Sequence, residues 1–278
     1  MTKKIRIALI SVFLLAAGIL ALAQFKPEEI TQREQWENFL LTADIVKSEP
    51  IGEGVTAPQK LYLKKGDVEK KAAWKNPSGK PDGVTDNWKS EIAAYRMDKL
   101  LGLNAIPPVV EREFQGKKGC LSLWTESKTS LLKMMEAGES IPEAVLERTN
   151  RMKYIARLWD CLIANADRTQ QNILYTDDWR TILIDHSRAF QSDQKFVQQL
   201  VFGANGIFKF EDGRPMLFRR VPRALVEKIK DLNAAAIKRA VGSYLTDKEI
   251  EAIVARVPLI LKEIQEMVKQ NGEANVLY

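Results

Sequence analysis

Two hydrophobic patterns divide the chain. Between residues 45 and 126, short runs alternate apolar and polar positions, clearest at 60–64, and Gly, Pro, Asn and Asp separate them, as in antiparallel strands. Beyond them, apolar residues recur at helical spacing, as in 149–163. One helical stretch, 88–101, interrupts the strands, and Gly102 follows as a stop signal. We therefore predict an α+β fold with a small antiparallel sheet, one helix beside it, and a mainly helical second part.

The N-terminus has its own pattern. Basic residues at positions 3, 4 and 6 precede an apolar run, 7–23, which closes on Ala21-Leu22-Ala23. This order is typical of a secretory signal peptide cleaved after Ala23, so we predict that the chain is exported, periplasmic or secreted. The run is longer than the usual h-region of about 7–15 residues and shorter than the ~20 residues of a spanning helix. An uncleaved N-terminal membrane anchor is the alternative.

Charge and cysteine content exclude several classes. Without residues 1–23 the 42 basic residues fall to 39 against 36 acidic ones, too weak an excess to indicate nucleic-acid binding. Cys120 and Cys161 each lie in an apolar stretch and are expected to be buried thiols rather than a bridge. His186 is the single histidine, and no G-x-S-x-G motif accompanies it, which argues against a Ser-His-Asp hydrolase.

The most informative stretch lies between residues 165 and 186. Asp167 and Asn172 are separated as in the kinase pattern H-R-D-x-x-x-x-N, and an apolar run then leads to Asp185 at a strand end. In phosphoryl transfer such an Asp orients or deprotonates a hydroxyl, and an Asn and a second Asp hold the metals that bridge ATP phosphates. Asp and Asn are also common in ordinary turns, which is the alternative for this stretch alone.

Upstream residues supply the remaining parts of such a site. Gly52 and Gly54 form a turn whose backbone could approach a phosphate, although a plain hairpin turn is the alternative and Ala57 stands where a third glycine might. Lys75 ends a strand after a small apolar run, and Glu91 lies near the start of the next helix. Each is also compatible with a surface role, the lysine as a solvated side chain and the glutamate as a first-turn acid.

In this order the residues resemble the protein-kinase-like superfamily. Asp-Arg at 167–168 with Asn172 is most similar to its atypical branch: the HipA-type kinases, the type II phosphatidylinositol 4-kinases and the secretory-pathway kinases related to the Golgi casein kinase. The resemblance covers roughly residues 45–190. Asp185 is followed by His186-Ser187 and not by Phe-Gly, so the usual hinge glycine is missing.

The resemblance implies a two-lobed, protein-kinase-like fold. Residues 45–126 would be the N-lobe, with a hinge at 125–127, and 127–278 the helical C-lobe; residues 24–44 would be a connecting helix. The resemblance implies that Asp167 is the catalytic base. Asn172 and Asp185 would be the ligands of Mg²⁺ or Mn²⁺. Lys75, fixed by Glu91, would hold the phosphates of ATP, and Gly52 and Gly54 would cover the nucleotide.

The sequence thus predicts an exported, ATP-dependent phosphotransferase that acts on a hydroxyl acceptor. The acceptor is not encoded in any motif and is a protein, a lipid or a small molecule; no nucleic-acid partner is expected, and the membrane is involved only through an uncleaved N-terminal segment. A kinase-like scaffold without catalysis and a protein AMP-transferase on the same fold are the alternatives.

Two further expectations concern local structure. The range 76–87, rich in Pro, Gly, Asp and Ser, is predicted to be loop. Thr246 and Glu249 form a capping box that opens a C-terminal helix, and Pro258 should kink or split that helix.

Overall fold

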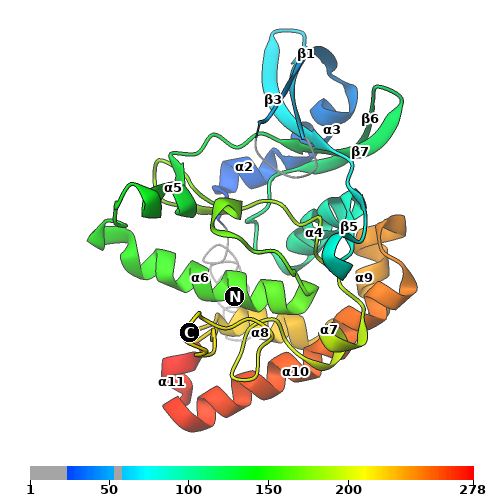
Figure 1. Cartoon of the computed structure of the whole chain (residues 1–278). Coiled ribbons are helices and arrows are strands. Elements are labelled where there is room, and N and C mark those ends of the chain that lie inside the picture. The colour runs from blue at the N-terminus through cyan, green and yellow to red at the C-terminus, as the bar shows by residue number, and fades with distance from the viewer. Residues whose placement is uncertain (1–23, 53–57) are drawn as a thin grey trace, which may run out of the picture.

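The computed structural model describes residues 24–52 and 58–278 and shows a small sheet above a mainly helical body (Figure 1). The predicted α+β class, a small antiparallel sheet with one helix followed by a mainly helical part, is confirmed. The predicted signal segment 1–23 lies outside the described residues, as do Gly54 and Ala57. In the part of the chain that is described, no helix combines the length and apolar character needed to cross a membrane.

The five-stranded sheet has the order β1-β2-β3-β7-β6 and is antiparallel throughout. Its strands are β1 (Asp44–Pro50), β2 (Gln59–Lys65), β3 (Val68–Lys75), β6 (Val109–Phe114) and β7 (Lys117–Leu123). The alternation seen in the sequence buries Leu61 and Leu63 on one face of β2, where they form a core with Leu121 and with Phe39 and Leu40. This core holds β3, and therefore Lys75, in a rigid position.

The segment before the sheet differs from the single connecting helix that the sequence predicts. It forms two helices, α2 (Pro27–Thr31) and α3 (Arg33–Thr42), separated at Gln32. The break allows Arg33 to point inward, where its guanidinium contacts the Asp98 carboxylate at 3.2 Å and the Asn104 amide oxygen at 2.5 Å. Because both Arg33 and Asp98 are buried, this segment is part of the folded body.

Helix α4 (Trp88–Leu101) lies beside the sheet. Asn87 caps it by accepting a hydrogen bond from the Lys89 amide, and Gly102 ends it in the left-handed conformation. The preceding range 76–87, predicted to be loop, contains a two-stranded sheet, β4 (Ser78–Gly79) with β5 (Asp86–Asn87), around the short 3₁₀ helix η1 (Pro81–Gly83). Strand pairs this short carry little periodicity, so composition alone indicated only loop.

The second part of the chain is built on two long helices, α6 (Glu143–Ile163) and α10 (Asp247–Asn271). A small three-stranded sheet, β10-β9-β8, joins a strand that precedes α5 to two strands that follow α6, and β10 leads to the predicted site. The remaining elements are α5 (Leu131–Glu136), β8 (Thr129–Ser130), η2 (Gln170–Asn172), β9 (Ile173–Tyr175), β10 (Thr181–Leu183), α7 (Gln194–Gln198), α8 (Arg223–Lys230), α9 (Ala234–Val241), η3 (Gly242–Tyr244) and α11 (Glu273–Val276).

Helix α10 confirms one local prediction and excludes one of the two outcomes expected at Pro258, a split helix. Thr246 and Glu249 form the expected capping box. Pro258 does not split the helix, which continues to Asn271. Proline lacks a backbone N–H donor and crowds the preceding turn of the helix. The buried Ile253 and Ile260, one before and one after Pro258, nevertheless pack this helix into the main core. Tertiary packing therefore outweighs the local cost.

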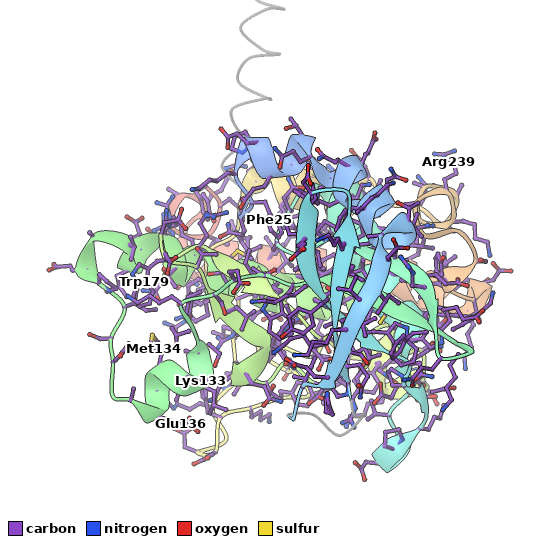
Figure 2. The ribbon with its side chains drawn as sticks, turned by 90° about the horizontal axis from the view of Figure 1, so that it is seen from above. Phe25, Lys133, Met134, Glu136, Trp179 and Arg239 are labelled. Carbon is purple, nitrogen blue, oxygen red and sulfur yellow. The ribbon has the colours of Figure 1, made fainter. Side chains whose placement is uncertain are left out.

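The main core runs continuously from α4 through α6 to α10, with Ile92, Leu158 and Ile260 among its buried members. A smaller cluster joins Met134 of α5 to Tyr175 and Trp179; Figure 2 labels Met134 and Trp179. Helix α4 and the end of α6 flank the predicted site. The continuous core fixes these two elements against each other.

Candidate active site

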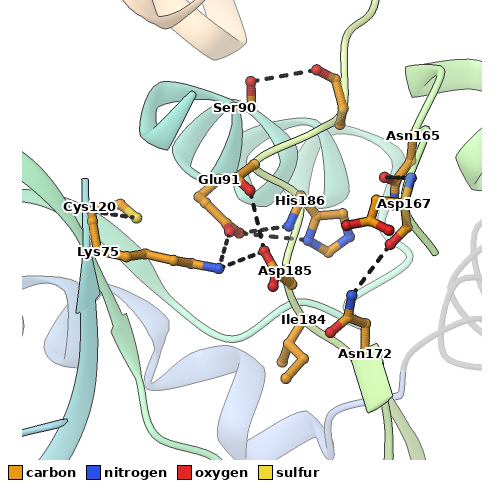
Figure 3. A network of polar contacts seen from close by, with 12 residues as sticks. Lys75, Ser90, Glu91, Cys120, Asn165, Asp167, Asn172, Ile184, Asp185 and His186 are labelled. Carbon is orange, nitrogen blue, oxygen red and sulfur yellow. Dashed lines mark hydrogen bonds and ion pairs between the residues drawn. The ribbon is translucent and has the colours of Figure 1, made fainter. Parts of the chain in front are cut away.

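Lys75, Glu91 and Asp185 come together from three separate elements (Figure 3). Lys75 ends β3, Glu91 lies in the first turn of α4, and Asp185 follows β10. The lysine ammonium forms ion pairs with the carboxylates of both Glu91 and Asp185, and its distance to Asp185 Oδ1 is 2.7 Å. Of the two orientations open to Glu91 in the sequence, the structure shows the inward one.

The Lys75 ammonium lies between two carboxylates in a mostly buried position, and burial together with the neighbouring Asp185 charge raises the pKa of Glu91 in spite of the lysine. Glu91 is 4% exposed. Burial alone would lower the pKa of Lys75, but the carboxylates of Asp185 and Glu91 outweigh it and raise that pKa above its ordinary value. Burial would likewise raise the pKa of Asp185, yet the Lys75 ammonium lowers it well below its usual range. The lysine is therefore protonated and Asp185 ionised, the states that phosphate and metal binding require.

The backbone around Asp185 is unusual. Asp185 has φ of 59°, the left-handed region that few residues other than glycine adopt, though Asp tolerates it better than most. The His186 amide donates to Glu91 Oε2 at 3.0 Å, and the Ser187 hydroxyl donates to Asp185 Oδ1 at 3.3 Å. Non-glycine residues in this region concentrate at functional sites, where the surroundings hold them.

His186 is completely buried and does not face the solvent. Its Nε2 lies 2.9 Å from Arg168 Nη2, and because an arginine only donates, Nε2 must accept and Nδ1 must carry the proton. Burial and the nearby Arg168 charge lower the pKa of His186 well below its ordinary value, so the ring is neutral. A buried, neutral imidazole with this partner does not serve as the base of a hydrolase.

Asp167 lies in the loop after α6, between two asparagines. Its amide donates to Asn165 Oδ1 at 3.1 Å, and Asn172 Nδ2 donates to the Asp167 carbonyl at 3.3 Å. The Asp167 side chain is 41% exposed. Burial raises the pKa of Asp167 above its ordinary value, although the neighbouring Arg188 opposes this change. The carboxylate is thus accessible and more basic than a free aspartate, as a general base needs.

Sequence reasoning missed the support beneath this loop. Arg168 and Asp160 form a buried ion pair, with Nη2 3.0 Å from Asp160 Oδ1, and Asn165 Nδ2 donates to the same oxygen at 3.0 Å. Arg168 also donates to the carbonyls of Asn172 and Ile184, at 3.2 and 2.8 Å. One guanidinium therefore ties the loop of Asp167 to Asn172 in η2 and to Ile184, the residue before Asp185. The sequence held one signal for this pair: Asp160 is an acidic residue inside the otherwise apolar run 158–162 of α6.

The glycine turn is only partly located. Gly52 follows β1 with φ of 76°, and a Cβ added there would meet nothing within 4 Å. The strained φ, rather than crowding, is what favours glycine at this position. Gly54 lies outside the described residues, so the predicted role of the turn stays a prediction.

Asn172 and Asp185 fit a divalent cation with oxygen ligands. The Asn172 amide nitrogen is engaged with the Asp167 carbonyl, so the amide oxygen remains as a ligand atom, and the Ile184 amide donates to the Asn172 carbonyl at 3.1 Å. Among the described residues no group of three or more His, Cys, Asp or Glu side chains is arranged to hold a metal by itself. Mg²⁺ in nucleotide sites ordinarily has one or two carboxylates and takes its other ligands from phosphates and water.

Comparison with known proteins gives structural relatives only. No protein-family model matches the chain, and no curated protein matches its sequence. Solved structures do match. A hydra Fam20 structure with sugar has a TM-score of 0.61 and 16% identity, over 89% of this chain and 92% of that one. The Golgi casein kinase with Mn/ADP bound has a TM-score of 0.62 and 14% identity, over 92% and 80%.

A bacterial structure, the Helicobacter pylori proinflammatory kinase CtkA, has a TM-score of 0.52 and 11% identity, over 84% of this chain and 97% of that one. At these identities the likeness concerns the fold. The chain therefore has an atypical protein-kinase-like fold, as the resemblance of its motifs implied.

Proposed function

We propose that the protein is an ATP-dependent phosphotransferase that transfers the γ-phosphoryl group to a hydroxyl acceptor. The observation that carries the proposal is the position of Lys75, whose ammonium contacts the carboxylates of both Glu91 and Asp185. In the kinase mechanism this lysine–glutamate pair and the metal-binding aspartate must be in place together. Here Lys75, Glu91 and Asp185 contact one another within a kinase-like fold, which supports the proposal.

Each residue then has one task. Lys75, fixed by Glu91, would hold the α- and β-phosphates, and Asp185 with Asn172 would bind Mg²⁺ or Mn²⁺. The metal, when bound, would neutralise charge on the β- and γ-phosphates. Asp167, accessible and with a raised pKa, would accept the proton of the acceptor hydroxyl as it attacks. Gly52 and Gly54 would cover the nucleotide.

Metal and nucleotide binding is also supported by the Golgi casein kinase structure, which was solved with Mn/ADP. Two observations support an exported protein. Residues 1–23 have the sequence pattern of a signal peptide, and the neighbouring structure is that of a kinase of the Golgi, a secretory compartment. The acceptor is left open between a protein, a lipid and a small molecule. Two alternatives use the same fold: a scaffold that binds without catalysis, and an AMP-transferase.

Intact-mass measurement tests the reaction type. The purified protein is incubated with ATP and Mg²⁺ or Mn²⁺, alone and with candidate acceptors, and product masses are compared with an incubation in EDTA. A gain of about 80 Da per group is expected for phosphorylation, whereas about 329 Da indicates AMP transfer. Nucleotide binding without any mass change or ATP consumption would support the scaffold.

A further inference from the structure

Arg188 lies beside the proposed base and joins it to a second acid. Its Nη1 is 3.6 Å from Asp167 Oδ2, and its Nε is 3.3 Å from Asp86 Oδ2. Asp86 belongs to β5, directly before α4, while Asp167 belongs to the loop after α6. A single guanidinium thus links Asp86 and Asp167, which are 81 positions apart in the sequence.

The backbone of this segment is fixed against both neighbours. The Ala166 amide donates to the Arg188 carbonyl at 3.2 Å, next to Asp167. On the other side, Gln191 binds the backbone of Thr85 twice: it accepts from the amide at 3.0 Å and donates to the carbonyl at 2.8 Å. Arg188 therefore starts from a defined position between its two acids.

The two acids differ in how firmly they are held. Asp86 is 5% exposed, and its Oδ1 has no hydrogen-bond partner among the described residues. A buried carboxylate is costly without a counter-charge, so Asp86 anchors the guanidinium. Asp167 is 41% exposed and would otherwise turn freely about its side-chain bonds.

On the basis of the proposed function, we propose that Arg188 is a positioning residue for the reaction. Anchored by Asp86, it holds Asp167 Oδ2 and so leaves Oδ1 directed to the acceptor hydroxyl. The proton of that hydroxyl passes to Oδ1 as its oxygen bonds to the γ-phosphorus and the bond to the leaving ADP oxygen breaks. Arg188 itself transfers nothing; it fixes the angle of the base.

The kinetic test uses the full chain with Arg188→Gln, Arg188→Lys, Asp86→Asn and the double variant Asp86→Asn/Arg188→Gln. Misplacing a reacting group by about 1 Å costs about 100-fold, so Arg188→Gln should lower kcat by about 10–100-fold, with KM for ATP changed less than about threefold. Arg188→Lys should recover part of this loss. Asp86→Asn should lower kcat less, and should add nothing when Arg188 is already Gln, because it acts through that residue.

Arg180→Gln is the matched control. Arg180 is also partly buried and also pairs two acids, Glu29 and Asp178, at 2.7 and 2.9 Å, but it lies on the β9–β10 hairpin away from the site. It should keep the parent kcat. A raised KM for ATP with unchanged kcat in Arg188→Gln, or additive losses in the double variant, would overturn the positioning role.

A crystal structure of Arg188→Gln supplies a readout that needs no turnover. The Asp167 carboxylate should leave its position or occupy several rotamers, while Lys75, Glu91 and Asp185 stay in place. If the parent transfers no phosphoryl group but Asp167 moves, the proposed function fails, and with it the catalytic role of Arg188; only its structural hold on the Asp167 side chain stands. If the parent is active and Arg188→Gln keeps both kcat and the Asp167 position, the positioning role alone fails.

Discussion

The two aspartates at the centre of the site are almost equally exposed but have opposite chemistry. The Asp185 side chain is 42% exposed and that of Asp167 is 41% exposed. The pKa of Asp185 is lowered because the Lys75 ammonium at 2.7 Å outweighs burial. The pKa of Asp167 is raised because burial outweighs Arg188, which is farther away at 3.6 Å.

The difference points to the neighbouring charge as the factor that separates the two proposed roles. A metal ligand must stay ionised, and a general base must be able to take a proton. Environments that move two carboxyl groups apart in pKa are a recurrent means of assigning such roles. Each of the following substitutions tests one side of this contrast.

The largest effect is expected for Asp185→Ala. In the parent, ATP with Mg²⁺ or Mn²⁺ at about a hundredfold over Kd should add about 2.7 kcal/mol to the free energy of unfolding. For a chain of this size that is a rise in Tm of roughly 5–10 °C. Asp185→Ala should lose this rise and all turnover, as EDTA should in the parent. An equal rise in the variant and the parent contradicts the metal assignment.

Asp167→Asn should separate binding from chemistry. The amide retains the shape of the side chain but takes no proton, so kcat should fall about 10²–10⁴-fold. The nucleotide-dependent rise in Tm should remain, because Asp167 is not expected to bind metal. The measurement is ATP turnover beside the thermal scan; a variant that loses binding as well would show that the two aspartates act as one unit.

Asp160→Asn tests the support beneath Asp167. It leaves the buried Arg168 without its carboxylate, and breaking a buried pair costs about 3–5 kcal/mol. Urea denaturation should show this loss in the free energy of unfolding. Glu147→Gln is the control, because Glu147 is 70% exposed where it pairs with Arg151, and such surface pairs contribute less than about 1 kcal/mol. Equal losses in the two variants would contradict the structural role of Asp160.

Glu91→Gln should have the smallest effect of the four. Lys75 keeps Asp185 as a partner, and the amide still accepts from the His186 backbone. Losing one charged hydrogen bond costs about 1.5–3 kcal/mol, so kcat/KM for ATP should fall about 10–100-fold. A loss as large as that of Asp185→Ala would mean that Lys75 does not hold its position through Asp185.

The sequence predicted the parts of the site that carry a spacing. Asp167 and Asn172 are five residues apart on one loop, and Asp185 ends an apolar run, so local pattern alone placed them. The inward direction of Glu91 stayed open, because a first-turn acid beside an apolar stripe suits either surface or core until tertiary contacts are known.

The residues that were missed act over long distances. Asp160 and Arg168 were not predicted as a pair because a buried ion pair leaves no periodic signal, and Asp86 meets Arg188 only through the fold. Pro258 was expected to kink or split its helix because of its local propensity; the helix is not split, because residues before and after the proline pack into the main core. Sequence pattern thus predicts local elements better than the contacts between them.

The inward-facing Arg33 has a consequence for how the chain matures. Its partners Asp98, Asn104 and Ile106 follow it by 65 to 73 residues, and Arg180 contacts the Gln24 carbonyl from 156 residues away. Synthesis proceeds from the N-terminus, so the first described helices emerge long before the surfaces that bury them. Non-local contacts of this kind slow folding, so α3 lacks its burying surface until residues 98–106 have been synthesised, and Gln24 and Glu29 lack theirs until the hairpin around Arg180 has formed.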